Sequence, residues 1–202
     1  MFTGIIEGIA RIKSIAKLEN GKRPAGMKMT VDLGRLGNGI KVGNSISING
    51  TCLTVTKIND KHHADFEIIG ETIRRTALGS LGIDDKVNVE RCLRFGDRIE
   101  GHLVLGHIDG TGRIENVINL SDGKKIWIKL MNKKLLRYIV PKGSVAVDGV
   151  SLTVVDVKHD HFSVAIIPHT ATVTTLGKRS KGDALNIEID VVSRYINILQ
   201  PK

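Results

Sequence analysis

The stretch INGTCLTV at residues 48–55 returns as VDGVSLTV at residues 147–154 of the same 202-residue chain. In both places apolar and polar residues alternate around an Asn-Gly or Asp-Gly pair, the strongest short-range signal of a β-hairpin with a two-residue turn. We expect Gly50 and Gly149 where the backbone needs a positive φ. The stretch predicts one tight hairpin, built twice.

Further segments repeat in the same order. GIIEGIARI from Gly4 returns as GHIDGTGRI from Gly106, and ETIRRTALG from Glu71 returns as HTATVTTLG from His169. VNVE and LNIE close the two copies. Self-similarity of this kind indicates an internal duplication, with connections that differ by a few residues as surface loops tolerate.

Each copy is rich in β structure. Val and Ile occur in short alternating runs among 22 Gly, and no long helical pattern interrupts them. We count about six strands in each copy, and a closed barrel would remove their exposed edges. The predicted fold is all-β: two similar six-stranded antiparallel barrels over residues 1–97 and 98–189.

The segment DVVSRYINILQPK, residues 190–202, has no counterpart at the end of the first copy. It predicts a helix with Asp190 as N-cap, Pro201 as its stop, and one apolar face formed by Val191, Val192, Tyr195, Ile196 and Leu199. That face could pack on the chain's own barrels or against the same helix in other subunits. We favour oligomerisation.

Composition narrows the function classes. The chain has 41% hydrophobic and 25% charged residues, and its net charge of +9 comes from 30 Lys and Arg against 21 Asp and Glu. The basic residues come in ones and twos without interleaved aromatic residues, which disfavours nucleic acid as a partner. A basic surface could still attract an anionic small molecule.

The two cysteines and the short apolar runs argue against a metal site, a disulfide framework and a membrane span. Cys52 and Cys92 form no CxxC pair, so neither a zinc site nor a disulfide framework is expected. No secretory signal and no run of about 18 apolar residues is present. We expect a soluble cytoplasmic protein without a membrane partner.

The two copies differ at three positions inside otherwise common segments. Asn49 becomes Asp148, Cys52 becomes Ser151, and Ile5 becomes His107. The second copy thus offers a carboxylate, a hydroxyl and an imidazole that can titrate near neutrality, whereas the first offers an amide and a thiol. Each has a structural alternative: a small buried hydrophobe for the cysteine, a loop contact for the histidine, and a turn former for the aspartate.

The segments MFTGIIEG, NGTCLTV, EGHLVLGH and DGVSLTV together resemble the riboflavin synthase family. The resemblance covers the whole chain, including the duplication and the final helix, and it implies Greek-key barrels. Two departures are visible, since the family often has glycine where Glu100 stands and a second cysteine where Thr51 stands. Neither changes a candidate site residue.

The resemblance implies an activity: two molecules of 6,7-dimethyl-8-ribityllumazine react together, and a four-carbon unit passes from one to the other. Riboflavin and 5-amino-6-(D-ribitylamino)uracil are the products, and no nicotinamide, flavin or metal cofactor is implied. It further implies a homotrimer assembled through the C-terminal helices, with the site between the first barrel of one chain and the second barrel of a neighbour. A non-catalytic antenna protein that binds lumazine or flavin in the same fold is the alternative.

The resemblance also implies site residues. Cys52 would lie near C7 of the substrate, the acid–base candidates are His107, Asp148 and Ser151, and Ser45 is a further catalytic candidate. The first substrate pocket would comprise Gly4, Ile5, Ile6, Cys52, Leu53, Thr54, Glu67, Ile68, Ile69, Thr72, Ile73, Arg74, Arg75, Thr76 and Ala77. The second would comprise His107, Ile108, Asp109, Lys142, Ser151, Leu152, Thr153, Ile166, Ile167, Pro168, Ala171, Thr172, Val173, Thr174, Thr175 and Leu176. Lys142 has a structural alternative, a solvated lysine in the turn before Gly143.

Overall fold

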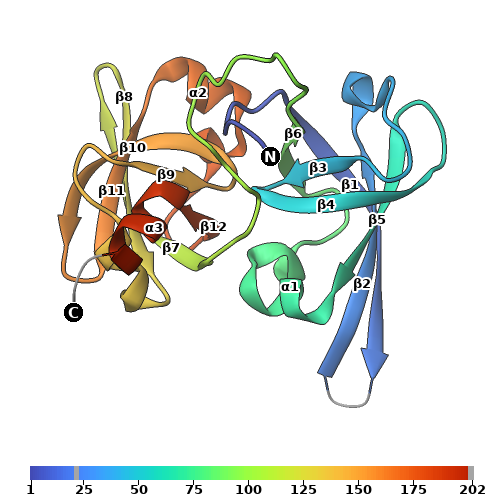
Figure 1. The fold of residues 1–202 in the computed structure, drawn as a ribbon, viewed down its shortest axis with the longest axis horizontal. Helices are drawn as coiled ribbons and strands as arrows, with labels where there is room; N and C mark the ends of the chain where they lie inside the picture. The colour runs from blue at the N-terminus through green and yellow to red at the C-terminus, as the bar shows by residue number, and fades with distance from the viewer. Residues whose placement is uncertain (21–22, 200–202) are drawn as a thin grey trace.

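The computed structural model describes residues 1–20 and 23–199, which form two closed barrels side by side (Figure 1). The strands of the first barrel are β1 (Gly8–Asn20), β2 (Arg23–Asp32), β3 (Ser45–Ile48), β4 (Thr51–Ile58), β5 (His63–Ile69) and β6 (Lys86–Arg91). Those of the second are β7 (Gly110–Leu120), β8 (Gly123–Leu130), β9 (Ser144–Val147), β10 (Val150–Lys158), β11 (His161–Ile166) and β12 (Ala184–Ile189). The prediction of two six-stranded antiparallel barrels is confirmed.

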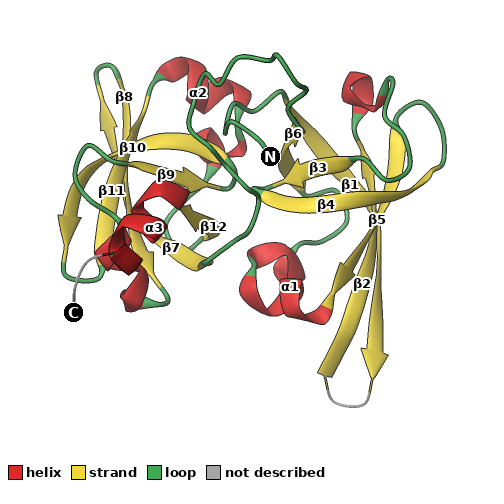
Figure 2. Ribbon diagram, in the orientation of Figure 1, coloured by secondary structure: helices red, strands yellow, loops and turns green. Residues whose placement is uncertain are grey.

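Both barrels have the same strand order. Around the first it is β1-β2-β5-β4-β3-β6, and the second repeats it as β7-β8-β11-β10-β9-β12. Because β2 pairs with β5 and the chain crosses the barrel to reach β3, the arrangement is a Greek key. A short helix follows the fifth strand of each barrel, α1 (Gly70–Arg75) in the first and α2 (Pro168–Val173) in the second, as Figure 2 shows.

The interior of each barrel is filled with side chains. Phe66 and the methionines of β2, Met27 and Met29, are buried in the first barrel, and Phe162 and Ile128 occupy corresponding depths in the second. A six-stranded barrel is too narrow to hold a ligand beside such side chains. Any bound molecule must therefore lie on the outside of a barrel.

The two repeated turns pack against each other. Asn49 and Gly50 have φ values of 44° and 79°, and Asp148 and Gly149 have 45° and 80°, as a type I′ turn requires. A Cβ atom on Gly50 would lie 2.6 Å from the backbone nitrogen of Gly149. The expected positive φ of both glycines is confirmed, and their second role is to let two backbones touch.

Four buried polar residues surround this contact: Asn49, Asn88, Asp148 and Asn186. The Asn88 side-chain amide donates to the Asp148 carbonyl at 2.9 Å, and that of Asn186 donates to the Asn49 carbonyl at 2.8 Å. We call the touching turns and these side chains the seam. The seam joins the barrels through hydrogen bonds that are shielded from water, where an unmade bond would be costly.

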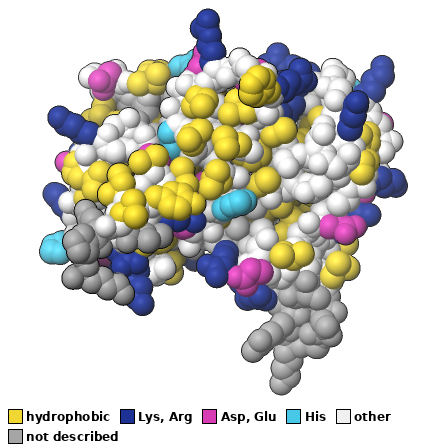
Figure 3. Space-filling model, viewed as in Figure 1, with side chains coloured by type: hydrophobic (Ala, Val, Ile, Leu, Met, Phe, Trp, Pro, Cys, Tyr) yellow, Lys and Arg dark blue, Asp and Glu magenta, His cyan; other side chains and the backbone are white. Residues whose placement is uncertain are grey.

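The C-terminal helix α3 (Val191–Leu199) lies on the second barrel and keeps one apolar face in solvent. The Asp190 carboxylate accepts the N–H of Val192 at 2.9 Å, as expected of an N-cap. Tyr195 is 63% and Leu199 81% exposed, and Figure 3 shows apolar side chains gathered on the face that carries α3. The predicted stop at Pro201 lies outside the described residues.

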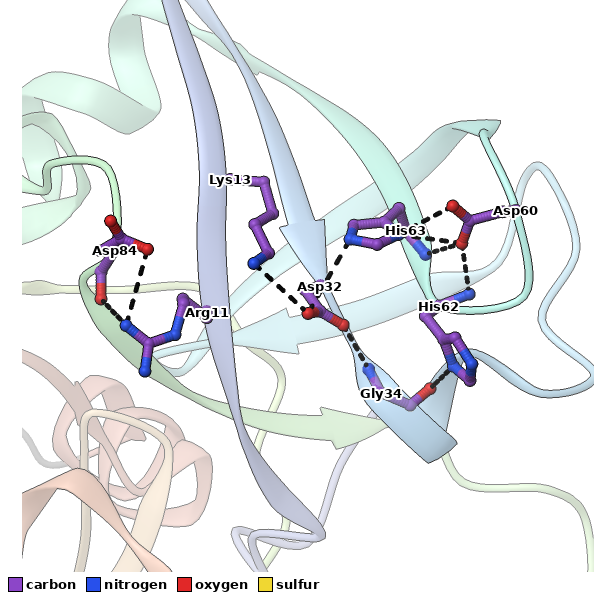
Figure 4. Close-up of polar contacts among 8 residues, drawn as sticks. All are labelled: Arg11, Lys13, Asp32, Gly34, Asp60, His62, His63 and Asp84. Atoms are coloured by element: carbon purple, nitrogen blue, oxygen red, sulfur yellow. Dashed lines mark hydrogen bonds and ion pairs between the residues drawn. The ribbon is translucent and has the colours of Figure 1, made fainter.

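A cluster of Asp and His side chains fastens the turn between β4 and β5 to the end of β2 (Figure 4). Asp60 accepts the N–H groups of His62 and His63, and these bonds lower the pKa of Asp60 to about 2. His63 lies between Asp60 and Asp32, and His62 contacts the carbonyl of Gly34 at 2.8 Å. Every member of the cluster has a partner, which indicates a structural role.

None of the helices in the described part of the chain is long and apolar enough to cross a membrane.

The seam predicts a difference between two glycines of positive φ. Gly43→Ala, at φ 90° with no atom within 4 Å of the added Cβ, should cost only the left-handed strain, ~1–2 kcal/mol. Gly50→Ala should cost a further ~1–3 kcal/mol, because its Cβ overlaps the opposite turn. Urea unfolding of both variants measures the difference, and equal losses would contradict the seam's role.

Candidate functional site

The outer faces of β4 and β10 carry the candidate polar groups. Burial alternates along both strands, so Cys52 and Thr54 of β4 point outward, as do Ser151 and Thr153 of β10. The intervening Leu53 points into the packed core. Because the barrel interiors are filled, these outer faces are the places where a small molecule could contact the thiol and the hydroxyl.

The chain crosses between the barrels at the start of each copy. We call residues 2–7 and 104–109 the crossover segments. The carbonyl of Gly4 accepts the N–H of Ser151 at 2.8 Å, and that of Gly106 accepts the N–H of Cys52 at 2.9 Å. In Figure 1 the N-terminus accordingly lies between the two barrels. Each copy therefore lends its first residues to the other copy's outer face.

This exchange changes the grouping expected from the sequence. Gly4 was expected in the first pocket with Cys52, yet it lies against Ser151; the segment bearing His107 was expected with Ser151, yet Gly106 lies against Cys52. Within one chain Cys52 therefore lies against the backbone of Gly106, the residue before His107. The hydroxyl instead faces the segment that carries Ile5.

Close contact makes glycine necessary in both crossover segments. Gly4 and Gly106 have φ values of 78° and 79°. A Cβ on Gly4 would lie 2.6 Å from the Cβ of Ser151, and one on Gly106 would lie 2.5 Å from that of Cys52. Any larger residue would push the segment away from the strand.

Two buried glutamates hold the crossover segments. Glu90, at the end of β6, accepts the N–H groups of residues 3 and 4, and Glu188 of β12 accepts those of Leu105 and Gly106 at 2.7 and 2.9 Å. Burial raises the pKa of both carboxyls, against the opposing effect of these hydrogen bonds, and that of Glu188 reaches about 7. The paired endings VNVE and LNIE therefore have a structural function.

His102, which was not among the predicted site residues, contacts Ser151. Its Nδ1 and the Ser151 hydroxyl oxygen are 2.7 Å apart, while its buried Nε2 has no hydrogen-bond partner within the described chain. Burial lowers the pKa of His102, although the Asp190 carboxylate opposes this. A neutral imidazole is therefore favoured beside the hydroxyl. The segment EGHLVLGH contained this residue, but the comparison of copies gave it no partner.

Asp148 belongs to the seam rather than to an outer face. Its side chain is fully buried, accepts the Asn186 N–H at 2.8 Å, and pairs with Arg179 at 3.2 Å. Burial raises the pKa of Asp148 to about 6, and Arg179 opposes the rise. In the first copy Asn49 and Leu81 occupy the equivalent positions. Where the second copy has the charged pair of Asp148 and Arg179, the first copy therefore has two uncharged residues. The acid–base role of Asp148 stays a prediction.

Many predicted pocket residues can offer only backbone groups. The side chains of Leu53, Ile68, Leu152, Ile166 and Leu176 are buried in the two cores. The hydroxyls of Thr76 and Thr174 donate to carbonyls in α1 and α2, those of Thr72 and Thr170. Ile69 and Ile167, in contrast, are 66% and 60% exposed at the end of β5 and just beyond β11. These two isoleucines mark equivalent apolar positions on the two outer faces.

A pocket of about 710 Å³ lies on the first barrel beside the link to the second. Ile5 and Ser45 line it together with Glu7, Arg91 and Cys92. Its size is within the usual range of small-molecule sites. Cys52 and Thr54 are not among its lining residues, although Thr54 is paired with Ser45 across β3 and β4. The pocket therefore adjoins the outer face that carries the thiol.

Lys142 has a strained backbone on the second barrel. Its φ is 67°, and the first copy has Gly43 at the equivalent position with φ 90°. A side chain at positive φ costs ~1–2 kcal/mol relative to glycine. Asp84 and His159 share this strain, so the substrate contact expected of Lys142 stays a prediction. Among the residues that the structure describes, no group of His, Cys, Asp or Glu is arranged to hold a metal ion.

Comparison with known proteins identifies related chains. A model of the lumazine binding domain matches residues 3–92 and again residues 105–190. The riboflavin synthase of Escherichia coli K12 is 42% identical over 191 residues, covering 94% of this chain and 87% of that protein. That of Bacillus subtilis 168 is 36% identical, covering 97% and 88%. A crystal structure of LumP complexed with riboflavin matches with a TM-score of 0.84 and 26% identity, covering 94% and 99% of the two chains.

The ion pair between the seam residue Asp148 and Arg179 gives a testable prediction. Arg179→Leu leaves the Asp148 carboxylate without its cation and should lower the free energy of unfolding by ~3 kcal/mol at pH 8. Asp148→Asn/Arg179→Leu, which reproduces the first copy, should recover most of that loss. Urea unfolding of the single and double variants measures both values.

The same variants carry a pH signature. Because the folded-state pKa of Asp148 is raised above its ordinary value of 3.8 to about 6, ionisation of Asp148 costs stability as pH rises through that window. The wild type should therefore lose at most ~3 kcal/mol between pH 4 and pH 7 relative to the double variant. Parallel pH profiles would refute this reading, and loss of turnover at unchanged stability would favour the acid–base role.

Proposed function

The chain belongs to the riboflavin synthase family, and on that premise we propose that it makes riboflavin from two molecules of 6,7-dimethyl-8-ribityllumazine. One molecule donates a four-carbon unit and is released as 5-amino-6-(D-ribitylamino)uracil. The main support is that each chain has two equivalent outer faces whose side chains differ at a few positions. Where the first face has Cys52, the second has Ser151. Two identical substrate molecules, one reacting as donor and the other as acceptor, need two similar sites that differ in chemistry.

Orientation supplies the main catalytic effect. Holding two ring systems together turns a rare encounter of two molecules into a reaction within one complex, an effect worth up to ~7–11 kcal/mol of the barrier in well-oriented systems. The filled barrels give rigid outer faces on which a ring can be held. Since donor and acceptor are the same compound, the exchange balances without an oxidant or reductant.

Specific side chains then move protons. Cys52 is proposed as the group near C7 of one substrate, with His107 on the crossover segment that lies against it. Ser151, which shares a hydrogen bond with His102, takes the equivalent place on the second barrel. Ser45 lines the pocket beside the thiol face, and Lys142 is proposed as a substrate contact.

We propose a homotrimer with the substrate site between subunits. The apolar face of α3 is exposed in the single chain, and the outer faces of β4 and β10 are open, so a neighbouring chain could cover all three. We also propose a cytoplasmic location, which the two free thiols fit.

A non-catalytic binding protein remains the second candidate. Solved structures of LumP with riboflavin and with 6,7-dimethyl-8-(1′-D-ribityl)lumazine share the fold, with TM-scores of 0.84 and 0.82. Identity to these chains is 26% and 25%, against 42% to the Escherichia coli synthase. The higher identity favours the enzyme.

Incubation of the pure protein with 6,7-dimethyl-8-ribityllumazine alone tests the function. Absorbance should show one riboflavin formed for every two lumazines consumed, without added cofactor. Cys52→Ser and His107→Gln should each lower turnover at least ~10-fold, in the range of a lost acid–base or nucleophilic group. Binding without turnover would identify the second candidate, and full turnover by both variants would overturn their assigned roles.

Assembly is tested through the exposed face of α3. Tyr195→Asp places a charge on the apolar face of α3. Because Tyr195 is 63% exposed in the single chain, the fold should be kept while association is lost. We expect the mass in sedimentation to fall from three chains to one. Asn197→Asp on the same helix is the control, and an unchanged mass for Tyr195→Asp would contradict assembly through α3.

A further inference from the structure

The duplication allows the two crossover segments to be compared contact by contact. In the first, the Glu7 carboxylate accepts the backbone N–H of Arg91 at 2.7 Å and is also bonded by that residue's guanidinium. In the second, the equivalent Asp109 accepts the backbone N–H of Ile189 at 3.0 Å. An apolar side chain thus stands where the first copy has arginine, and the second carboxylate needs another cation.

That cation comes from the C-terminal helix. The guanidinium of Arg194 in α3 lies 2.8 and 3.0 Å from the two carboxylate oxygens of Asp109. Asp109 is 15% exposed, so its charge is largely removed from water. Burial raises the pKa of Asp109, and Arg194 opposes that rise. The helix therefore supplies what β6 supplies in the first barrel.

The same region is tied to the chain end at a second point. Glu188, three residues before the start of α3, accepts the N–H groups of Leu105 and Gly106, and the Gly106 carbonyl in turn accepts the N–H of Cys52. His107 lies between this anchor and Asp109. The stretch from residue 105 to residue 109 is thus fixed on one side by the end of β12 and on the other by the first turns of α3.

We propose that Arg194 is a positioning residue that links the seating of α3 on the second barrel to the position of His107 against the Cys52 face. Arg194 lies on the side of α3 that contacts the second barrel, whereas the exposed apolar residues lie on the side that faces solvent. A neighbour that covers the apolar side would hold α3 in place and thereby fix residues 105–109. The catalytic part of this inference rests on the proposed function.

Alkylation of Cys52 tests the link without requiring turnover. In a Cys92→Ser background, Arg194→Gln should raise the rate of Cys52 modification by iodoacetamide at least ~3-fold, because the segment covering the thiol loses one anchor. Arg194→Lys should restore much of the protection. Arg113→Gln, which removes an exposed guanidinium bonded to the Gly182 carbonyl, is the matched control and should leave the rate unchanged.

Two comparisons separate positioning from assembly. Asp109→Asn should raise the alkylation rate as Arg194→Gln does, and the double variant should add nothing further, since both remove one contact. Tyr195→Asp removes association but keeps the pair with Asp109. Because loss of association would itself expose Cys52 under this proposal, Arg194→Gln is also measured in the Tyr195→Asp chain, where it should still raise the alkylation rate. If Arg194→Gln raises the rate there no more than Arg113→Gln does, the proposal is overturned.

Turnover gives the catalytic readout. We expect Arg194→Gln to lower kcat ~10-fold with a smaller change in KM, and Arg194→Lys to recover most of kcat. An unchanged kcat beside faster alkylation would overturn the catalytic part. If the wild type forms no riboflavin, the proposed function fails, whereas the alkylation rates still decide whether Arg194 positions residues 105–109.

Discussion

Backbone contact between two type I′ turns determines the arrangement of the molecule. Gly50 and Gly149 approach so closely that neither can carry a Cβ without overlap, and the surrounding amides satisfy each other across the contact. This packing fixes the starts of β4 and β10 relative to each other. Since Cys52 and Ser151 lie one residue further along these strands, the seam also fixes where the reactive side chains stand.

The crossover segments turn this symmetric contact into two unlike sites. Each segment contacts the other copy's strand before the first strand of its own barrel begins, so every outer face combines residues from both halves of the chain. Equivalent glutamates, Glu90 and Glu188, hold both segments in the same way. The backbone frame is therefore shared, and the chemical difference between the faces resides in a few side chains such as His107.

The sequence sufficed for the parts of the fold that depend on local patterns. Alternation and turn chemistry predicted the barrels, the positive φ of Gly50 and the helix after Asp190, because each depends on neighbours along the chain. The exchange between copies depends on hydrogen bonds between residues far apart in the chain, Cys52 to Gly106 and Ser151 to Gly4, and no local pattern encodes that pairing. No local pattern marks the contact of His102 with Ser151 either, because the two residues are 49 positions apart.

The exchange also constrains how the two repeats can change through recombination. Repeats within one gene can be made alike by gene conversion, which would copy Ile5 over His107 or the reverse. Because each of these residues lies on a segment seated on the other copy's strand, such an event would alter the partner of the thiol or of the hydroxyl while leaving both barrels foldable. A change in one repeat therefore alters the surroundings of a reactive side chain that belongs to the other repeat.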